Sequence, residues 1–194
     1  MRIKLLFSFL FLGFGSIYSY QLYEVPIDEY APNDMLLHAS SINNIEYVQK
    51  ALDQGADINS QDDGYTALMR SVMRGHEAIV KLLLENNANP NVQNNIAQTA
   101  LMLVVYFRPE NRATLNIVKL LLDAGAFTDL VDKEGETALY KANKQGKDSI
   151  ATFIEAEAEK RKIQKQQAKK EIVETACLLP ELADIVLEYA NYPT

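Results

Sequence analysis

Apolar residues occupy helical positions twice within one short segment of the chain. In residues 64–91, GYTALMRSVMRGHEAIVKLLLENNANPN, they occur around Leu68 and Val72 and again across residues 79–84. A spacing of three and four residues places such side chains on one face of a helix. Gly75 separates the two groups and is typical of a helix C-terminus. The segment therefore predicts two short amphipathic helices joined by a tight turn.

The same pattern returns along the chain at a regular interval. Thr66 and Thr99 begin matching segments 33 residues apart, and Thr137 begins another 38 residues later, because five residues are inserted near residues 107–116. Residues 34–59 fit the same frame before the first of these segments. One helix pair cannot bury its apolar face alone, whereas stacked pairs bury a continuous core. The sequence therefore predicts four stacked units.

The ends of the predicted helices carry residues suited to helix ends. Thr66, Thr99 and Thr137 stand where a hydroxyl accepts a hydrogen bond from a free amide of the first turn. Asn87 and Gly125 stand where the second helix ends and a left-handed residue is needed. The two kinds of residue predict matching helix boundaries in successive units.

This period, with the ordered motifs G-x-T-x-L, G-H, I-V-K-L-L-L and A-x-x-N, closely resembles the ankyrin repeat. The resemblance implies an all-α fold, an ankyrin-repeat solenoid of helix–turn–helix repeats joined by short hairpin-like turns. It covers residues 31–155 and places the repeats at about 31–62, 63–95, 96–133 and 134–155. Residues 156–194 then form a C-terminal helical extension.

Two positions depart from the family pattern. The family's Pro after the threonine is replaced by Ala67, Ala100 and Ala138, and its His two residues later by Met69, Met102 and Tyr140. The hydrogen bonds that this His makes between repeats are therefore expected to be missing. We expect less rigid coupling between repeats but the same fold, because apolar burial carries most of the stabilising free energy.

The resemblance also implies a binding surface for a protein partner. Ankyrin stacks bind proteins on the concave surface formed by the turn tips and the ends of the first helices. The matching positions in this chain, with one residue of the insertion, are Asp63, Tyr65, Met73, Arg74, Ile96, Gln98, Tyr106, Phe107, Arg108, Glu136 and Lys144.

Repeat three is unusual among these positions. Tyr106 and Phe107 stand where the family is usually polar, directly before Arg108 and the insertion. Aromatic and arginine side chains are enriched in binding hot spots. Two interpretations are open: the rings are exposed to a partner, or the inserted residues fold over them.

The first residues of the chain have the pattern of a secretory signal. A basic MRIK segment precedes an apolar run of 13 residues, Leu5 to Ile17. As a helix this run rises only about 20 Å, less than the hydrocarbon core of a bilayer. We expect residues 1–19 to be a signal peptide rather than an uncleaved anchor. The mature protein would then be periplasmic or secreted, with no stable membrane span.

Charge and cysteine content limit the partners and the stabilising bonds. The formal net charge of −7 becomes −9 once residues 1–19 are removed, since Arg2 and Lys4 leave with them. An acidic surface repels nucleic acid backbones, so we expect no nucleic acid partner. Cys177 is the single cysteine, which excludes an intramolecular disulfide. The absence of an Asn-x-Ser/Thr sequon favours a bacterial source.

The sequence offers little catalytic chemistry. Its two histidines, His38 and His76, fall within the repeat frame, and we assign both a structural role. We find no His/Cys cluster at metal spacing, no nucleophile elbow and no glycine-rich phosphate loop. We therefore predict a protein that is not an enzyme and needs neither a cofactor nor a metal.

The extension after the repeats contains two predicted helical segments. Residues 155–171 lack Gly and Pro and allow i,i+4 pairs such as Glu157–Arg161, which predicts an exposed helix. Residues 178–190 follow with an apolar stripe at helical spacing: Leu182, Ile185, Val186 and Tyr189. This second helix either covers the open end of the last repeat or docks a partner, because L-P-x-x-L loosely resembles the F-box-like ends of some ankyrin-repeat proteins.

Two functions fit these observations. The first is an exported, monomeric and non-enzymatic module that binds a protein partner through the ankyrin stack. The alternative is a secreted effector or adaptor whose C-terminal F-box-like helix recruits a host complex while the repeats hold a target.

Overall fold

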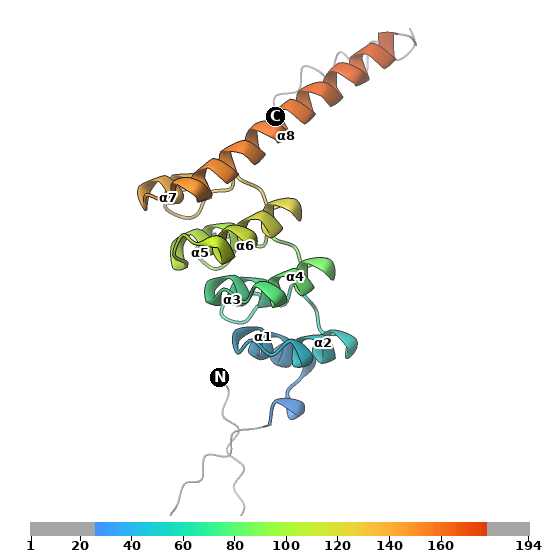
Figure 1. Ribbon diagram of the computed structural model, residues 1–194. Helices are drawn as coiled ribbons and strands as arrows, with labels where there is room; N and C mark the ends of the chain where they lie inside the picture. Colours follow the sequence, from blue (N-terminus) through green and yellow to red (C-terminus); the bar gives the residue numbers. More distant parts are fainter. Residues whose placement is uncertain (1–25, 178–194) are drawn as a thin grey trace, which may run out of the picture.

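The computed structural model describes residues 26–177, and within them the chain forms eight α-helices and one 3-10 helix (Figure 1). In chain order these are η1 (Ile27–Glu29), α1 (Pro32–Ser41), α2 (Ile45–Asp53), α3 (Ala67–Arg74), α4 (Glu77–Glu85), α5 (Ala100–Phe107), α6 (Arg112–Asp123), α7 (Ala138–Lys144) and α8 (Asp148–Cys177). The β-type pairing found in this range is one isolated bridge between Asp62 and Tyr65. The predicted all-α class is confirmed.

Consecutive helices pair, and the pairs stack in chain order (Figure 1). Each first helix packs against the first helix of the next pair, so that α1, α3, α5 and α7 form one layer. The second helices, α2, α4, α6 and α8, form the other layer. Figure 1 shows the first helices along the left side of the stack and the second helices along the right. This arrangement confirms the predicted ankyrin solenoid.

The first helices begin and end at the residues that the sequence predicts. The hydroxyl of Thr66 accepts a hydrogen bond from the amide of Met69 at 3.2 Å, and Thr99 and Thr137 cap α5 and α7 in the same way. After α3 the chain turns at Gly75, whose φ is 76°, a left-handed conformation that glycine adopts without strain. These contacts satisfy backbone groups that a helix end leaves unpaired.

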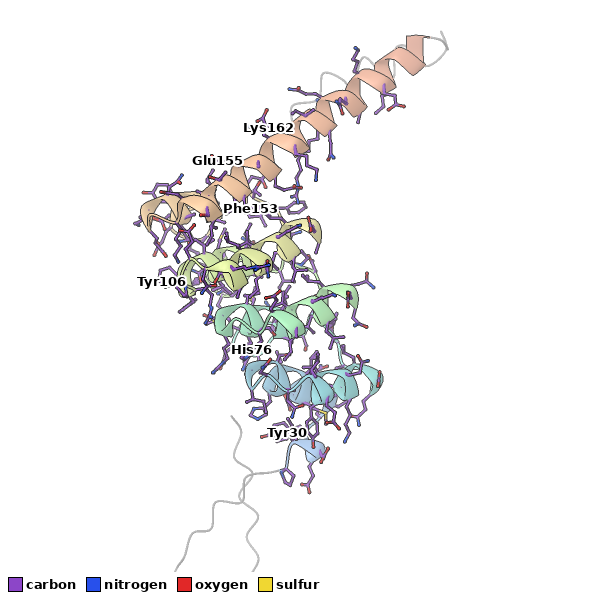
Figure 2. All side chains as sticks on the ribbon, in the orientation of Figure 1. Tyr30, His76, Tyr106, Phe153, Glu155 and Lys162 are labelled. Atoms are coloured by element: carbon purple, nitrogen blue, oxygen red, sulfur yellow. The ribbon has the colours of Figure 1, made fainter. Side chains whose placement is uncertain are left out.

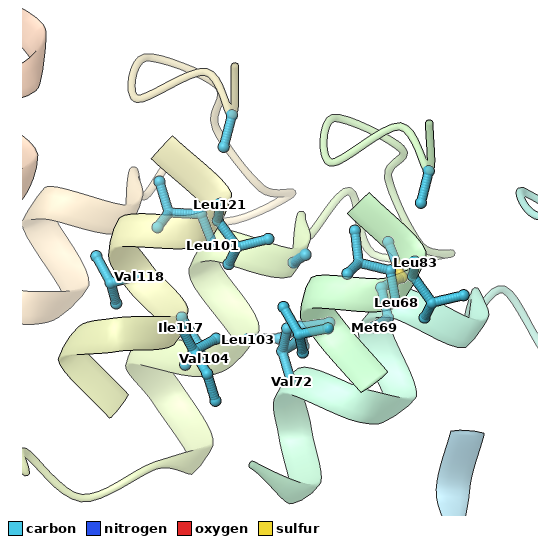
Figure 3. Packing of buried hydrophobic residues seen from close by; sticks show 14 of the residues in the cluster. Leu68, Met69, Val72, Leu83, Leu101, Leu103, Val104, Ile117, Val118 and Leu121 are labelled. Carbon is cyan, nitrogen blue, oxygen red and sulfur yellow. The ribbon is translucent and has the colours of Figure 1, made fainter. Parts of the chain in front are cut away.

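The core lies between the two helix layers and runs through all repeats. Leu68 and Leu83 from the second pair pack in one cluster with Leu101 and Leu121 from the third (Figure 3). At most 2% of any of these side chains is exposed. Burying a leucine side chain contributes about 1.5–3 kcal/mol. The apolar stripe therefore holds the stack together, as the sequence predicts.

The insertion in repeat three is divided between a loop and a helix. The connection between α5 and α6 has four residues, 108–111, whereas Gly75 and His76 suffice between α3 and α4. The helix α6 has 12 residues and α4 has 9. Two of the five inserted residues thus lengthen the loop (4 − 2) and three lengthen the helix (12 − 9). The added turn leaves the stacking of the repeats intact.

Polar side chains link successive repeats and replace the histidine contacts that the sequence lacks. The amide of Asn89 donates to the side chain of Asn59 at 2.8 Å, and the amide of Phe127 donates to Asn91 at 2.7 Å. Gln93 donates to the backbone oxygen of Val131 at 3.2 Å. The sequence predicts less rigid coupling because the hydrogen bonds of that histidine are missing. This prediction is incomplete, since asparagine and glutamine side chains in the loops supply other hydrogen bonds between repeats.

The first and last repeats end differently. At the N-terminal end, Ile27 and Tyr30 pack against the core, and Asp28 accepts a hydrogen bond from Lys50 at 2.6 Å. At the other end, α8 passes residue 155 without a break and continues to Cys177, because the segment contains no Gly or Pro. The predicted exposed helix of residues 155–171 is thus part of the same helix that completes repeat four.

Two predictions concern residues outside the described range. The signal peptide, residues 1–19, and the amphipathic segment 178–190 both lie there. Among the helices of residues 26–177, none has the length and apolar content needed to cross a membrane.

Candidate partner-binding surface

The ends of the first helices place equivalent side chains in successive repeats. Met73, Tyr106 and Lys144 each lie seven residues after the threonine that caps their helix. Because α3 packs on α5 and α5 on α7, these positions recur across the stack. Met73 is half-buried against the core, whereas Tyr106 and Lys144 are exposed.

Tyr106 and Phe107 form the main apolar feature of this surface. Their rings meet edge to face with centroids 5.0 Å apart, and 56% of Tyr106 and 48% of Phe107 is exposed. Figure 2 shows Tyr106 at the end of α5, at the edge of the stack. The insertion therefore leaves both rings accessible, and the structure favours the first of the two interpretations of repeat three.

Arg108 does not project outward beside these rings. Its guanidinium lies against Gly75 of the preceding repeat, so closely that a Cβ built on Gly75 would come within 2.6 Å of it. The C-terminus of α3 carries a partial negative charge, which a cation at this place stabilises. Arg108 thus lies between repeats two and three, and its contact with a partner stays a prediction.

Glu136 and Lys144 belong to an ion-pair network in repeat four. Lys141 is 4% exposed, and its amine lies 2.6 Å from Asp132 and 2.7 Å from Glu136. Lys144 approaches the second oxygen of Glu136 at 2.7 Å. Hydrogen bonds from Lys141 and Lys144 lower the pKa of the Glu136 carboxyl. Glu136 is therefore occupied within the repeat, whereas Lys144 remains exposed.

The turn tips divide in the same way between exposed and structural residues. Asp63 is exposed with a φ of 52°, and its backbone oxygen accepts a hydrogen bond from Asn95 at the following turn tip at 3.2 Å. Ile96 is 48% exposed. Tyr65 packs against the core, and the side chain of Gln98 contacts Asn94 within its own tip.

The structure thus separates the predicted surface into two groups. Tyr65, Met73, Gln98, Arg108 and Glu136 are half-buried and contact other parts of the stack. The exposed residues, together with Tyr140, form what we call the first-helix face: Asp63, Arg74, Ile96, Tyr106, Phe107, Tyr140 and Lys144.

Tyr140 belongs to this face although the sequence reasoning did not select it. It holds the position of Met69 and Met102, each 1% exposed, yet 54% of Tyr140 is exposed. The amine of Lys144 lies over its ring, 5.6 Å from the centroid. The available signal was that repeat four is the last, so a side chain at this position has no following repeat to cover it.

The described residues combine a carboxylate cluster in repeat four with exposed aromatic and cationic side chains. The carboxylates of Asp132, Glu134 and Glu136 lie close enough to hold a cation, but the amine of Lys141 is already positioned between two of them. His76 contacts the backbone oxygen of Ser41 in the preceding repeat at 3.1 Å, which agrees with the structural role assigned to it. Exposed aromatic rings, together with the exposed cations Arg74 and Lys144, can bind apolar side chains and accompanying carboxylates.

The comparisons with known proteins agree with this architecture. Residues 16–94 and 86–166 match the family model described as "Ankyrin repeats (3 copies)". A protein of Treponema pallidum (strain Nichols), named as ankyrin repeat-containing, is 32% identical over 111 residues. That alignment covers 56% of this chain and 36% of the relative.

Two further relatives carry the same kind of name. A fowlpox virus protein is 37% identical over 57% of this chain and 32% of its own length. An Escherichia coli (strain K12) protein is 29% identical over 60% of this chain and 75% of its own. The chain thus spans about a third of the Treponema and fowlpox proteins, and what these proteins share with it is the repeat region.

Proposed function

Because the chain belongs to the ankyrin repeat family, we propose that it is an exported, non-enzymatic module that binds a protein partner through the first-helix face. Ankyrin repeats are in general protein-interaction modules. The observation that carries the proposal for this chain is the exposed, edge-to-face pair of Tyr106 and Phe107. Two large rings, each about half exposed, supply desolvated area when a partner covers them.

The surroundings of the two rings support the same assignment. Ile96 adds an exposed apolar side chain at a turn tip, and Arg74 and Lys144 add cations in the neighbouring repeats. Such a mixture of aromatic, aliphatic and cationic groups is typical of interface cores with a polar rim. We expect a monomer to bind a partner that presents apolar side chains flanked by carboxylates.

The binding proposal is tested with Tyr106→Ala combined with Phe107→Ala. Proteins captured from the source organism's exported fraction are identified, and the affinity of the purified partner is measured for both forms. We expect the double variant to bind more weakly by at least about 2 kcal/mol, because the two rings would form a hot spot. Its unfolding midpoint should stay close to that of the parent protein.

The matched control is Phe127→Ala, since 53% of Phe127 is exposed in the loop that follows α6 and lies outside the first-helix face. This change should leave the affinity unaltered. An unchanged affinity in the double variant, or an equal loss in the control, would contradict the assignment of the hot spot.

Export is the part of the proposal that rests on residues 1–19. The basic start and the 13-residue apolar run of that segment support it. We expect the exported protein to begin between Ser16 and Gln21, as measured by mass spectrometry of its N-terminal peptide. Exported material that retains Met1 would refute cleavage, and protein found in the cytosolic fraction alone would refute export.

A further inference from the structure

The part of α8 beyond the repeats carries one continuous basic face. Ala158, Lys162, Lys165, Lys169 and Ile172 follow one another at intervals of four and three residues, which places them on one side of the helix. All but Ala158 are exposed, and Ala158 is half-buried. We call this set the basic stripe.

The basic stripe begins at a groove against repeat three. The groove has a volume of about 480 Å³ and lies between α8 and the loop that follows α6, with Phe127, Lys162 and Lys165 among its lining residues. Arg161 fixes the two walls relative to each other, since it donates to the backbone oxygens of Leu122 at 2.9 Å and Ala126 at 2.7 Å. The stripe is therefore held in place at its repeat-proximal end.

We propose that residues 178–190 of this chain bind antiparallel to α8 along the basic stripe. This segment follows Cys177, the last residue of α8, and its charged residues are all acidic: Glu181, Asp184 and Glu188. The part of the stripe nearest Cys177 contributes Lys165 and Lys169 and no acid. The two surfaces thus have opposite charge. The stripe ends in the apolar Ile172, and the segment carries apolar side chains between its acids.

The length of α8 decides where the segment can bind. From Ile154, a core residue at the base of α8, to Cys177 is 23 residues, or about 35 Å of helix. Residues 178–190 span only about 20 Å as a helix. The segment therefore cannot return as a helix to the open end of the stack beside Tyr140, whereas it reaches the far half of the stripe.

If the chain turns at residues 178–179, residues equally far from the turn lie side by side, and apolar residues then meet apolar ones and acids meet lysines. Val186 comes level with Ile172, and Glu188 comes level with Lys169. Lysine side chains can lay their methylene stems along apolar groups while their amines extend to carboxylates. An apolar seam with flanking ion pairs results, which makes α8 and the segment a helical hairpin. The proposal is independent of the first-helix face and leaves that face open to a partner.

A disulfide experiment tests the contact directly. In full-length protein with Cys177→Ser, Lys169→Cys combined with Tyr189→Cys should cross-link within one chain, at a rate that does not depend on protein concentration. The control pair is Gln167→Cys with Tyr189→Cys, because Gln167 lies at the same height on the opposite side of α8. Equal rates for the two pairs would overturn the proposal. Cross-linked dimers alone would assign the stripe to a second copy instead.

Amide hydrogen exchange tests the role of charge. We expect protection at residues 182–189, and Lys165→Glu with Lys169→Glu should speed their exchange about tenfold or more by releasing the segment. Lys160→Glu with Gln167→Glu adds acidic groups on the opposite side of α8 and should leave the protection unchanged. A parent protein without protection at these residues, or equal loss in both double variants, would overturn the proposal.

Discussion

The turn tips before α5 and α7 are equivalent, but a different residue accepts the hydrogen bonds of the free backbone amides in each. The side-chain oxygens of Asn94 and Asp132 each accept hydrogen bonds from two backbone amides of their own tip. In α7, Lys141 contacts the charged Asp132. The equivalent residue of α5, after the neutral Asn94, is the buried Leu103. A buried charge is tolerated when a partner and hydrogen bonds compensate it. A charged residue at the turn tip thus occurs together with a charged residue in the first helix, and a neutral residue with a neutral one.

This network predicts an acid-sensitive contribution to stability. Burial by itself raises the pKa of Asp132, but hydrogen bonds from Lys141 and the tip amides outweigh it and hold that pKa below its ordinary value. A carboxyl whose pKa is lowered by folding stabilises the protein above its unfolded pKa and loses this effect as the pH falls through the folded pKa. We expect stability to fall below about pH 4, measured by urea unfolding.

Two substitutions that copy the residues of repeat three test this ion-pair network. Asp132→Asn should cost about 1–3 kcal/mol at pH 7, because Lys141 keeps only Glu136, and the difference should shrink below pH 4. Adding Lys141→Leu reproduces the combination of repeat three and should restore part of the loss. Glu155→Gln, at an exposed carboxylate, serves as the control. A loss that is independent of pH would contradict the ionic origin.

Two basic side chains join α8 to the helix ends of repeat three. Lys147, which directly precedes α8, donates to the backbone oxygens of Val105 and Arg108 at the end of α5. Burial lowers the pKa of this amine. Arg161 makes the corresponding contacts with the end of α6. Cations at a helix C-terminus satisfy unpaired carbonyls and the negative end of the helix dipole. These contacts fix α8 against repeat three.

A substitution of Arg161 tests how much these contacts between helices stabilise the protein. Arg161→Met removes two charge-assisted hydrogen bonds and should destabilise the protein by about 1.5–3 kcal/mol. Lys162→Met is the matched control, since 71% of the neighbouring Lys162 side chain is exposed and its ion pair with Glu159 is at the surface. Thermal unfolding measures both. Equal effects of the two substitutions would show that the cap contributes nothing beyond a surface charge.

Over the whole molecule, stability depends on contacts between neighbouring repeats. The core cluster is continuous from Met35 in the first pair to Ile154 in the last. In such a stack each repeat contacts only its neighbours, so damage to an inner repeat affects both of its interfaces. The second repeat is inner in this sense, because α3 contacts both α1 and α5.

Leu83 in α4 is the residue that tests this property. It is fully buried, and Leu83→Ala should cost about 2–5 kcal/mol through lost burial and a residual cavity. Glu85→Ala, two residues along the same helix at an exposed position, should change the unfolding free energy by less than about 0.5 kcal/mol. Denaturant unfolding distinguishes the two. A small cost at Leu83 would mean that the repeats are not coupled as the packing indicates.

Much of the fold could be predicted from local patterns in the sequence. The threonine caps, the left-handed turns at Gly75 and Asn87, and the buried stripe around Leu83 each depend on a few neighbouring residues. Because the repeat recurs, these local signals also fix which helices stack. The ankyrin solenoid and the burial of its core were therefore determined by the sequence alone.

The candidate binding surface depends on contacts between residues that are distant in the chain. The sequence placed Tyr106, Phe107 and Arg108 together, but only the packing of repeat three on repeat two decided that the rings are exposed and that the guanidinium lies on Gly75. The lack of a repeat after α7 likewise exposes Tyr140. Helix periodicity encodes which face is apolar, whereas exposure is set by the neighbour that covers that face, and only the tertiary structure contains that neighbour.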